Sequence, residues 1–310
     1  MFVKNLELTN FRNIKATKLS FKNKLNIFCG KNGQGKTNIA ESLYLVFNGK
    51  SFRKCKRKEL IRYNCNNTEI NANVILNDNL PLEISIEIEE NKKDIKINGK
   101  TKKNIENPIY KKSFFLNSDL LFYCKNFANY RLALLDKLCY LKKGKNFLIE
   151  LYRYKRVIKQ LKLDKNSNIW IKLLKKQSKI VYDYRMSLFN EIYNIYKDNT
   201  KALGIDDIDL YVGIKNKFEF DFMRLDKRDL SLGELKTAIF ALILSTLSSN
   251  GDSSYILIID DFNSEWDNEM LFKILEMLNE RNVQSFIMSS EIINNYPHFV
   301  VEKGEVSGYE

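Results

Sequence analysis

The segment FCGKNGQGKT, residues 28–37, carries the residues with the clearest capacity for chemistry in this chain. Its glycines, lysine and threonine have the spacing G-x-x-x-x-G-K-[ST], which is typical of loops that bind nucleotide phosphates. In such loops the backbone N–H groups surround the phosphates, the lysine neutralises the β and γ oxygens, and the hydroxyl binds Mg²⁺. We therefore expect an ATP and Mg²⁺ site, with Lys36 also acting in catalysis. Its loop residues are Gly30, Lys31, Asn32, Gly33, Gln34, Gly35, Lys36 and Thr37.

A second group of reactive side chains follows the apolar run YILII, which leads into Asp260 and Asp261. The run predicts a buried strand, and α/β sheets bind their ligands at the carboxyl ends of such strands. We expect Asp260 to hold Mg²⁺ together with Thr37, and Asp261 to polarise the water that attacks the nucleotide. Adjacent aspartates at a strand end can also serve solubility alone, and this alternative remains open.

The segment LSLGELK, residues 230–236, places Ser231 and Gly233 just before an apolar helix. The N-terminus of a helix carries free amides and a positive partial charge, which suit a phosphate. We therefore add Ser231 and Gly233 to the expected nucleotide-binding residues. The alternative is an ordinary helix cap, because Ser231 and Glu234 have the spacing of a capping box.

The elements that must position these residues follow an α/β pattern. Residues 2–8 and 24–28 have the composition of strands, and the second strand leads directly into the phosphate loop and a helix. Alternation over 70–97, followed by Asn98-Gly99, predicts an antiparallel sheet with a hairpin turn. The C-terminal part predicts short strands near 209–222, the helix of LSLGELK, the strand of YILII, a helix from about 267 and the strand VQSFIMS.

Residues 127–203 have a different character, because they contain no proline and a single glycine, Gly144. Leu, Ile and Tyr recur there at helical spacing among many lysines and arginines, which predicts a subdomain of three helices. The α/β pattern returns afterwards without a linker, so this subdomain is expected as an insertion. We predict a nucleotide-binding head from residues 1–120 and 205–310, and a helical arm from residues 121–204.

Composition narrows the function classes. With a single histidine, His298, the chain cannot build a multi-histidine metal site. A Ser-His-Asp triad would have to use this one histidine, which argues against such a triad. The five cysteines are scattered and form no Cys-x-x-Cys pair, as in reduced proteins of the cytosol. The N-terminus lacks a signal-peptide core, and the run AIFALIL is short for a membrane span. We expect a cytoplasmic protein that does not contact a membrane.

Positive charge indicates a polyanionic partner. The chain has 51 lysines and arginines against 38 acidic residues, a formal net charge of +13, although an AT-rich genome could also produce such a surplus. Phosphate contacts of this kind give salt-sensitive binding to DNA without a sequence preference. Basic runs occur at 49–58, 142–145, 152–162 and 172–179. The residues we favour for DNA contact are Arg53, Lys54, Lys56 and Arg57.

These motifs resemble those of known proteins at two levels, a broad class of ATPases and a narrower family. LSLGELK, followed by ILIIDDFNSEWD, resembles the signature, Walker B and D-loop series of ABC-type ATPases of the SMC/Rad50 class. LELTNFRN, which contains Arg12, together with NGKSFR, KINGK and DLLFYCKNFANYRLALLD, resembles the RecF DNA replication and repair family. The resemblance implies an α/β fold: an ABC-type ATPase head, with an antiparallel β subdomain beside the P-loop NTPase sheet, and an inserted helical arm. It also adds Arg12 to the expected nucleotide-binding residues.

The resemblance implies a function as well. RecF-like proteins bind ATP and Mg²⁺ and form a nucleotide-dependent head-to-tail dimer on DNA at gaps and single-strand/double-strand junctions, where they help RecO and RecR to load RecA. On this pattern Ser231 and Gly233 would reach the γ-phosphate held by Lys36 of the other subunit. Near Ser289 or Ser290, where ABC transporters have a switch histidine, this chain has hydroxyl residues. Slow, DNA-stimulated ATP hydrolysis is therefore expected, with ATP acting mainly as a dimerisation switch.

The chain departs from the family pattern in several places. The usual Gly-Pro-His-Arg-Asp-Asp stretch has no match between 205 and 228, and LNSD at 116–119 replaces Ser-Pro-Glu-Asp. An SMC-like ATPase of a defence or chromosome-maintenance system, driving a different partner, is therefore a second hypothesis. A monomeric P-loop kinase for a small molecule is a third, in which LSLGELK would only cap a helix.

Overall fold

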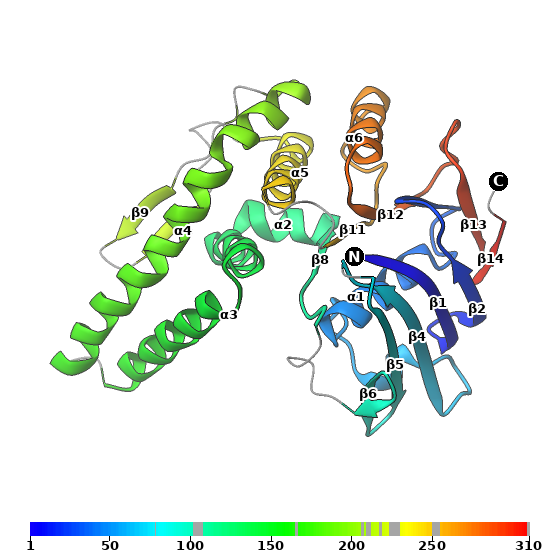
Figure 1. Cartoon of the computed structure of the whole chain (residues 1–310), viewed down its shortest axis with the longest axis horizontal. Helices are drawn as coiled ribbons and strands as arrows, with labels where there is room; N and C mark the ends of the chain where they lie inside the picture. The colour runs from blue at the N-terminus through cyan, green and yellow to red at the C-terminus, as the bar shows by residue number, and fades with distance from the viewer. Residues whose placement is uncertain are drawn as a thin grey trace. The chain divides into compact units, whose positions relative to one another are not determined.

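The computed structural model describes residues 1–77, 79–101, 108–164, 167–205, 208, 212–216, 219–222, 230–249 and 255–308. The chain forms two compact units (Figure 1). The first contains Met1–Ser118 and Gly251–Glu310, and the second contains Asp119–Asn250. The boundary predicted from the sequence, with a head that includes 205–250, remains a prediction, and each unit is described by itself here.

The first unit contains a mostly parallel sheet in the order β14-β13-β3-β12-β11-β8. All neighbours from β13 to β8 pair in parallel, and β14 adds an antiparallel edge. Every residue of β3, β11 and β12 is buried, which explains the apolar sequence of β11 and the apolar centre of β12, Phe286–Met288. The strands are β3 (Leu25–Cys29), β8 (Ser113–Leu116), β11 (Ile256–Ile259), β12 (Gln284–Ser289), β13 (His298–Glu302) and β14 (Glu305–Ser307).

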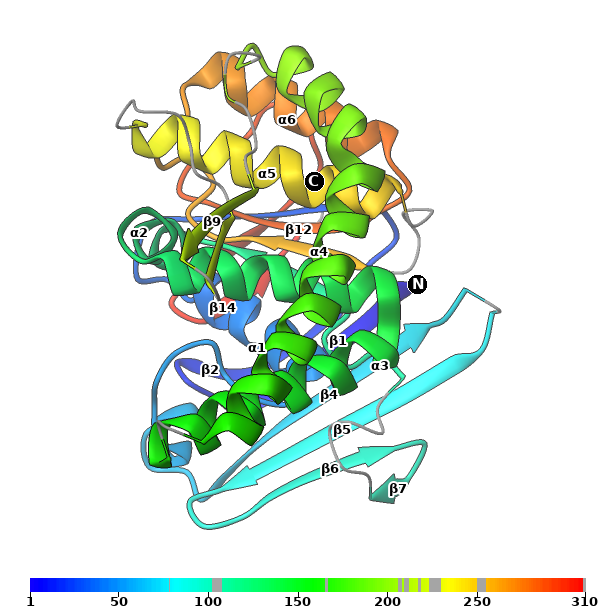
Figure 2. The ribbon, with the colours of Figure 1, turned by 90° about the vertical axis from the view of Figure 1, so that its left-hand side faces the viewer.

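A second sheet of the same unit is antiparallel, in the order β2-β1-β4-β5-β6-β7 (Figure 2). Burial alternates along β5, so one face of this sheet supplies apolar side chains to the core. Asn98 and Gly99 form the turn between β6 and β7 with φ of 47° and 74°, which confirms the predicted hairpin. The strands are β1 (Phe2–Phe11), β2 (Ile14–Ser20), β4 (Asn67–Ile75), β5 (Pro81–Glu89), β6 (Lys93–Ile97) and β7 (Lys100–Thr101).

The described residues of the first unit form two α-helices and one 3₁₀ helix. Helix α1 (Lys36–Asn48) begins directly after the phosphate loop and ends at Gly49, whose φ of 64° suits a left-handed C-cap. The 3₁₀ helix η1 (Arg57–Leu60) follows in the basic loop. Helix α6 (Asn268–Glu280) begins at Asp267, whose carboxylate accepts the N–H of Met270 at 2.8 Å.

The second unit is mainly helical. It contains α2 (Ser118–Asn126), α3 (Ala128–Leu163), α4 (Asn168–Ala202), the two-stranded hairpin β9 (Val212–Asn216) and β10 (Glu219–Phe222), and α5 (Leu232–Ser248). Gly144 has φ 68° and ψ −152°, so α3 consists of two helical segments. Figure 1 shows one segment end-on and the other in the plane of the picture. With α4, these segments give three helices between 127 and 203, as predicted.

None of the helices in the described residues is long and apolar enough to cross a membrane.

Candidate functional site

The phosphate loop lies at the carboxyl end of β3, a central strand of the parallel sheet. β3 pairs with β12 on one side and β13 on the other, which places the loop at the sheet edge where ligands bind in α/β folds. Gly35 is the N-cap of α1 with φ 122°, and a Cβ there would meet the side-chain oxygen of Asn13 at 3.0 Å. The chain therefore needs glycine at this position to turn from loop to helix.

The hairpin of β13 and β14 supports the loop from the C-terminal side. Gln34 accepts the N–H of Lys303 on its side chain at 2.6 Å and the N–H of Gly304 on its backbone oxygen at 2.8 Å. Gly30 has φ 155°, and a Cβ there would lie 2.3 Å from the carbonyl oxygen of Val301 in β13. The loop is thus fixed by backbone contacts that leave no room for a side chain at residue 30.

We expect Gly30→Ala to lower the free energy of unfolding by roughly 3 kcal/mol, because the new Cβ must displace the backbone of β13. Gly33→Ala is the matched control, since its φ of 80° also disfavours alanine but no atom lies within 4 Å of the new Cβ. That variant should cost roughly 1 kcal/mol. Urea unfolding followed by circular dichroism measures both, and equal losses would contradict the close contact.

Lys36 folds back over the loop. Its ammonium group donates hydrogen bonds to the carbonyl oxygens of Gly30 and Lys31, the second at 2.9 Å, and the residue is 8% exposed. Burial lowers the pKa of Lys36, while the nearby charges of Asp260 and Asp261 oppose this shift. The cation therefore lies between the loop and the two aspartates, where it can neutralise a bound phosphate.

Thr37 and Asp260 come together although 223 positions separate them. The hydroxyl of Thr37 donates to the carboxylate of Asp260 at 3.2 Å, and Asp260 is 3% exposed at the end of β11. Burial raises the pKa of Asp260 to about 6, the charge of Asp261 adds to the rise, and the bond from Thr37 opposes it. The structure thus brings together the two residues that the sequence predicts as magnesium ligands.

These residues fit a magnesium ion. Mg²⁺ prefers hard oxygen ligands and is commonly held by one or two protein groups together with phosphate and water oxygens. A threonine hydroxyl and a buried carboxylate supply such oxygens. Burial and the charge of Asp261 raise the pKa of Asp260, and a bound cation would favour its ionised form.

The pKa of Asp260 leads to a stability prediction. Because its pKa is raised on folding, from 3.8 to about 6, the folded state binds this proton more tightly than the unfolded state. Ionisation therefore destabilises the ligand-free protein progressively between about pH 4 and pH 6, and fully above that window. We expect Asp260→Asn to raise the free energy of unfolding by roughly 2 kcal/mol at pH 8 and to change it little at pH 4. Unfolding without nucleotide or Mg²⁺ measures both values, and a destabilised variant at pH 8 would contradict the expectation.

Asp261 follows in a tight turn. Its φ is 51°, and its carbonyl oxygen accepts the N–H and the hydroxyl of Ser264 at 3.0 and 2.6 Å. The residue is exposed, and Ser118 donates to its carboxylate at 3.4 Å. An exposed carboxylate beside Asp260 is accessible to water, which is the requirement for its predicted role. Ser118 was not among the predicted site residues, although LNSD marks its position in the sequence.

The neighbouring strand end presents Ser289 and Ser290, the predicted switch position. Ser289 donates its hydroxyl to the side-chain oxygen of Asn263 at 2.6 Å, and the backbone N–H of Ser290 donates to the same oxygen at 3.1 Å. Asn263 therefore connects the turn after β11 to the end of β12.

Arg12 and Arg53 converge on one buried carboxylate. Glu41 of α1 is 0% exposed, and it binds Arg12 at 2.7 and 3.0 Å and Arg53 at 2.9 Å. Arg12 also donates to the carbonyl oxygen of Glu59 at 2.7 Å. Burial works to lower the pKa of Arg12, but its bonds to Glu41 outweigh burial, and the pKa is raised. A predicted nucleotide-binding residue and a predicted DNA-binding residue thus share a partner that sequence reasoning missed.

A chain of hydrogen bonds connects this pair to the phosphate loop. Arg53 donates to Asn38 at 2.9 Å, Asn38 donates to Asn13 at 2.8 Å, and Asn13 donates to the carbonyl oxygen of Gln34 at 3.1 Å. Arg53 also lowers the pKa of Asp260 through its charge, although burial dominates and raises that pKa. Among the four predicted DNA contacts, Arg53 is thus the one tied to the nucleotide loop.

The other three predicted DNA contacts differ from Arg53. Lys54, Lys56 and Arg57 are exposed, and the Arg57 guanidinium donates to the carbonyl oxygen of Asn91 at 2.7 Å. Their charges lie at the surface around η1, where they are available to a polyanion.

Ser231 and Gly233 belong to the second unit. Ser231 is the N-cap of α5, and its hydroxyl oxygen accepts the N–H of Glu234 at 3.1 Å. Glu234 in turn accepts the N–H of Ser231 at 2.9 Å, so the capping box considered from the sequence is present. Lys125 donates to the carbonyl oxygen of Leu230 at 2.9 Å and supports the same turn. Both Ser231 and Leu232 are exposed, and the Glu234 carboxylate lies at this helix N-terminus.

Comparisons with known proteins identify relatives of this chain. The family model described as "RecF/RecN/SMC N terminal domain" matches residues 2–295. A protein of Clostridioides difficile (strain 630) named DNA replication and repair protein RecF is 31% identical, in an alignment that covers 100% of this chain and 99% of that protein. A protein of the same name from Clostridium kluyveri is 28% identical over 99% of this chain and 100% of its own length.

Solved structures support the fold. A structure of the recombination mediator protein RecF with ATP has a TM-score of 0.77 and 23% identity, covering 99% of this chain and 97% of that one. The Smc head bound to the C-terminal winged-helix domain of ScpA has a TM-score of 0.69 at 15% identity, covering 99% and 96%. The predicted α/β fold of an ABC-type ATPase is therefore confirmed. With a family model that matches nearly the whole chain and a full-length relative above 30% identity, the chain belongs to the RecF family.

Proposed function

We propose that this chain is an ATP-dependent DNA-binding protein of replication and recombinational repair. The observation that carries the proposal is the approach of Thr37 to Asp260 at 3.2 Å beside a complete phosphate loop, in a chain that aligns with RecF proteins over its whole length. Proteins of that name and a structure of RecF with ATP support ATP as the nucleotide.

In this proposal the first unit binds the nucleotide. Backbone N–H groups of residues 30–35 surround the phosphates, and Lys36 leaves the carbonyl oxygens of Gly30 and Lys31 to neutralise them. Thr37 and Asp260 would hold Mg²⁺, which supplies charge neutralisation when bound. Asp261 orients and polarises the attacking water. Arg12 adds positive charge near helix α1, where it bonds Glu41.

A second copy of the chain completes the site in this proposal. Ser231 and Gly233 of one copy contact the γ-phosphate at Lys36 of the other, in a head-to-tail dimer. The support is the exposed N-terminus of α5, where the partial positive charge of the helix favours an anion. Hydrolysis is slow and DNA-stimulated, so that ATP serves mainly to close the dimer.

DNA is the proposed partner of the dimer, with gaps and single-strand/double-strand junctions as its targets. Lys54, Lys56 and Arg57 contact phosphates without reading sequence, and Arg53 contributes from the Glu41 network. RecR is the proposed protein partner, and RecO and RecA act downstream in the loading of RecA on gapped DNA.

Binding to gapped DNA tests this function. With Mg²⁺ and ATP, the protein should bind a gapped duplex in a gel-shift assay, and raising the salt from 50 to 200 mM should weaken binding by at least roughly tenfold. Deletion of the gene should impair recovery from damage that leaves gaps. Normal gap repair after deletion, together with salt-independent binding, would favour the SMC-like alternative with a different partner.

A further inference from the structure

The middle of the second unit carries an unusual concentration of positive charge. Residues 141–180 contain thirteen lysines and arginines against two acidic residues. Some of these cations are paired: Lys142 and Lys143 with Glu191, Arg153 with Glu150, and Lys155 with Asp136. In the described part of the chain, other exposed cations form no ion pair. These are Lys145, Arg156, Lys159, Lys162, Lys172, Lys175, Lys176 and Lys179.

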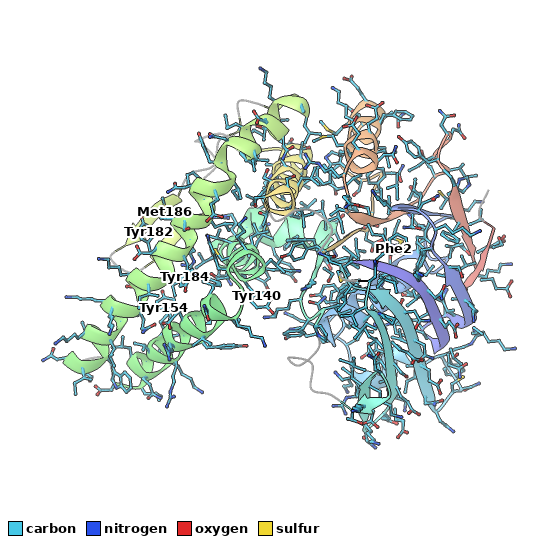
Figure 3. The ribbon with its side chains drawn as sticks, in the orientation of Figure 1. Phe2, Tyr140, Tyr154, Tyr182, Tyr184 and Met186 are labelled. Carbon is cyan, nitrogen blue, oxygen red and sulfur yellow. The ribbon has the colours of Figure 1, made fainter. Side chains whose placement is uncertain are left out.

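An apolar groove opens within this basic region. It has a volume of about 610 Å³, and both segments of α3 and the helix α4 contribute to its walls. Most of its surface is apolar, and Tyr154, one of its lining residues, is labelled in Figure 3. The apolar lining residues are Leu132, Ala133, Tyr154, Ile158, Leu161 and Leu174. A groove of this size is in the range of ligand-binding pockets.

The groove lining also contains charged groups with a surplus of positive charge. Arg185 is 2% exposed and donates two hydrogen bonds to Asp136, at 2.7 and 3.0 Å, so both groups are already satisfied. The ammonium group of Lys155 lies 3.9 Å from the same carboxylate and is 59% exposed. Lys162 is exposed at the groove and has no ion-pair partner among the described residues. Lys155 and Lys162 can therefore receive an anion at the rim.

We propose that this groove is a docking site for an acidic peptide segment of a partner protein, one that carries bulky apolar side chains between aspartates or glutamates. The apolar side chains would fill the groove, and the carboxylates would pair with Lys155 and Lys162 of its lining. The groove is apolar and the cations at it are positively charged. A peptide with both apolar and acidic side chains matches both properties.

DNA fits the same surface less well. Its phosphates would satisfy the unpaired cations, but they would leave the apolar walls of Leu132, Ile158 and Leu174 without a partner. A peptide with apolar anchors removes those walls from water as well.

This docking site is separate from the nucleotide site. Its lining residues all belong to the second unit and none is a nucleotide-site residue. Peptide binding should therefore be unchanged in Lys36→Met, which keeps a failure of this inference distinct from a failure of the proposed function.

Fluorescence anisotropy with labelled synthetic peptides tests the inference on the full-length protein. One panel of short peptides has Phe and Leu residues placed among Asp and Glu. A second panel has the same charges but serine at every apolar position. We expect saturable binding by members of the first panel, and at least tenfold weaker binding by their serine counterparts. A gapped DNA duplex serves as competitor.

Two variants and one matched control locate the site. Ala133→Glu places a carboxylate on the groove wall, and Lys162→Glu reverses the charge of the rim. Each should weaken peptide binding at least tenfold. Lys179→Glu makes the same charge change on an exposed lysine outside the groove lining, and it should change peptide binding less than threefold. Circular dichroism and ATP affinity confirm that each variant is folded.

Three results would overturn the inference. The first is the absence of binding by every peptide of the apolar panel. The second is equal affinity for the two panels, which would mean that the region binds any polyanion, DNA included. The third is an equal loss in Lys162→Glu and Lys179→Glu, with Ala133→Glu unaffected.

Discussion

Lys36→Met is expected to lower the affinity for ATP at least roughly 100-fold, and with it the nucleotide-dependent assembly of the protein. Lys36 is 8% exposed as a residue, and its ammonium group bonds to the loop carbonyls, so its charge lies in a largely buried position. Each charge-assisted hydrogen bond to a phosphate contributes about 1.5–3 kcal/mol, and the loss of two such bonds gives an effect of this size. Methionine keeps an unbranched side chain that is one atom shorter, and it removes the charge and the donors.

Isothermal titration calorimetry with ATP and Mg²⁺ measures this effect. Lys50→Met is the matched control, because Lys50 is an exposed lysine just past the end of α1 and forms no ion pair in the described residues. Its affinity should equal that of the wild type. An affinity of Lys36→Met within threefold of the wild type would remove Lys36 from the nucleotide site.

Ser231→Arg is expected to leave ATP binding unchanged and to abolish dimerisation. The nucleotide loop belongs to the first unit, whereas Ser231 caps α5 in the second, so a single copy should bind ATP without this serine. In the proposed dimer the arginine would place a long side chain where the amides of α5 must approach the γ-phosphate of the other copy. The loss of the cap itself costs only about 1 kcal/mol.

Analytical ultracentrifugation with Mg²⁺ and a non-hydrolysable ATP analogue separates these effects. Glu234→Ala is the control, because it removes the return bond of the capping box but keeps the Ser231 hydroxyl. This variant should still dimerise. Normal dimerisation of Ser231→Arg would show that the N-terminus of α5 does not take part in a shared site.

The phosphate loop and its strand and helix could be predicted because each depends on local sequence. The motif fixes the loop, the apolar run before it fixes β3, and helical spacing after it fixes α1. Asp260 was predictable for the same reason, since the apolar run YILII ends where a parallel strand meets the ligand edge. These features need no knowledge of which segments approach one another.

The supports of the loop depend on contacts between distant segments and could not be read from the sequence. Glu41 stands in an ordinary helical pattern, and only the fold shows that it receives both Arg12 and Arg53. The hairpin of β13 and β14 was not predicted either, because residues 298–307 form short strands with little alternation. Yet the backbone of β13 leaves no room for a side chain at residue 30. The strands β2 and β8 and the role of Ser118 were missed for similar reasons.

The second unit shows a different limit. Helical periodicity predicted the three helices of residues 127–203, and the structure shows that one break between them lies at Gly144. Periodicity does not reveal which positions remain uncovered after packing. The groove lined by Leu132, Ile158 and Leu174 arises only when both segments of α3 and α4 are assembled. The Gly-Pro-His-Arg-Asp-Asp stretch of the family has no match between 205 and 228, and much of that range lies outside the described residues. The strands predicted near 209–222 are present as β9 and β10.

The central claim is that two copies of this chain share each nucleotide. The most direct test is the rate of ATP hydrolysis per chain, with gapped DNA and Mg²⁺, as protein concentration rises from the nanomolar range. If two copies must meet, turnover per chain rises with concentration and then levels off, and Ser231→Arg stays at the lowest value throughout. A turnover per chain that is constant over the whole range, and equal in Ser231→Arg, would mean that one copy is sufficient and would contradict the account.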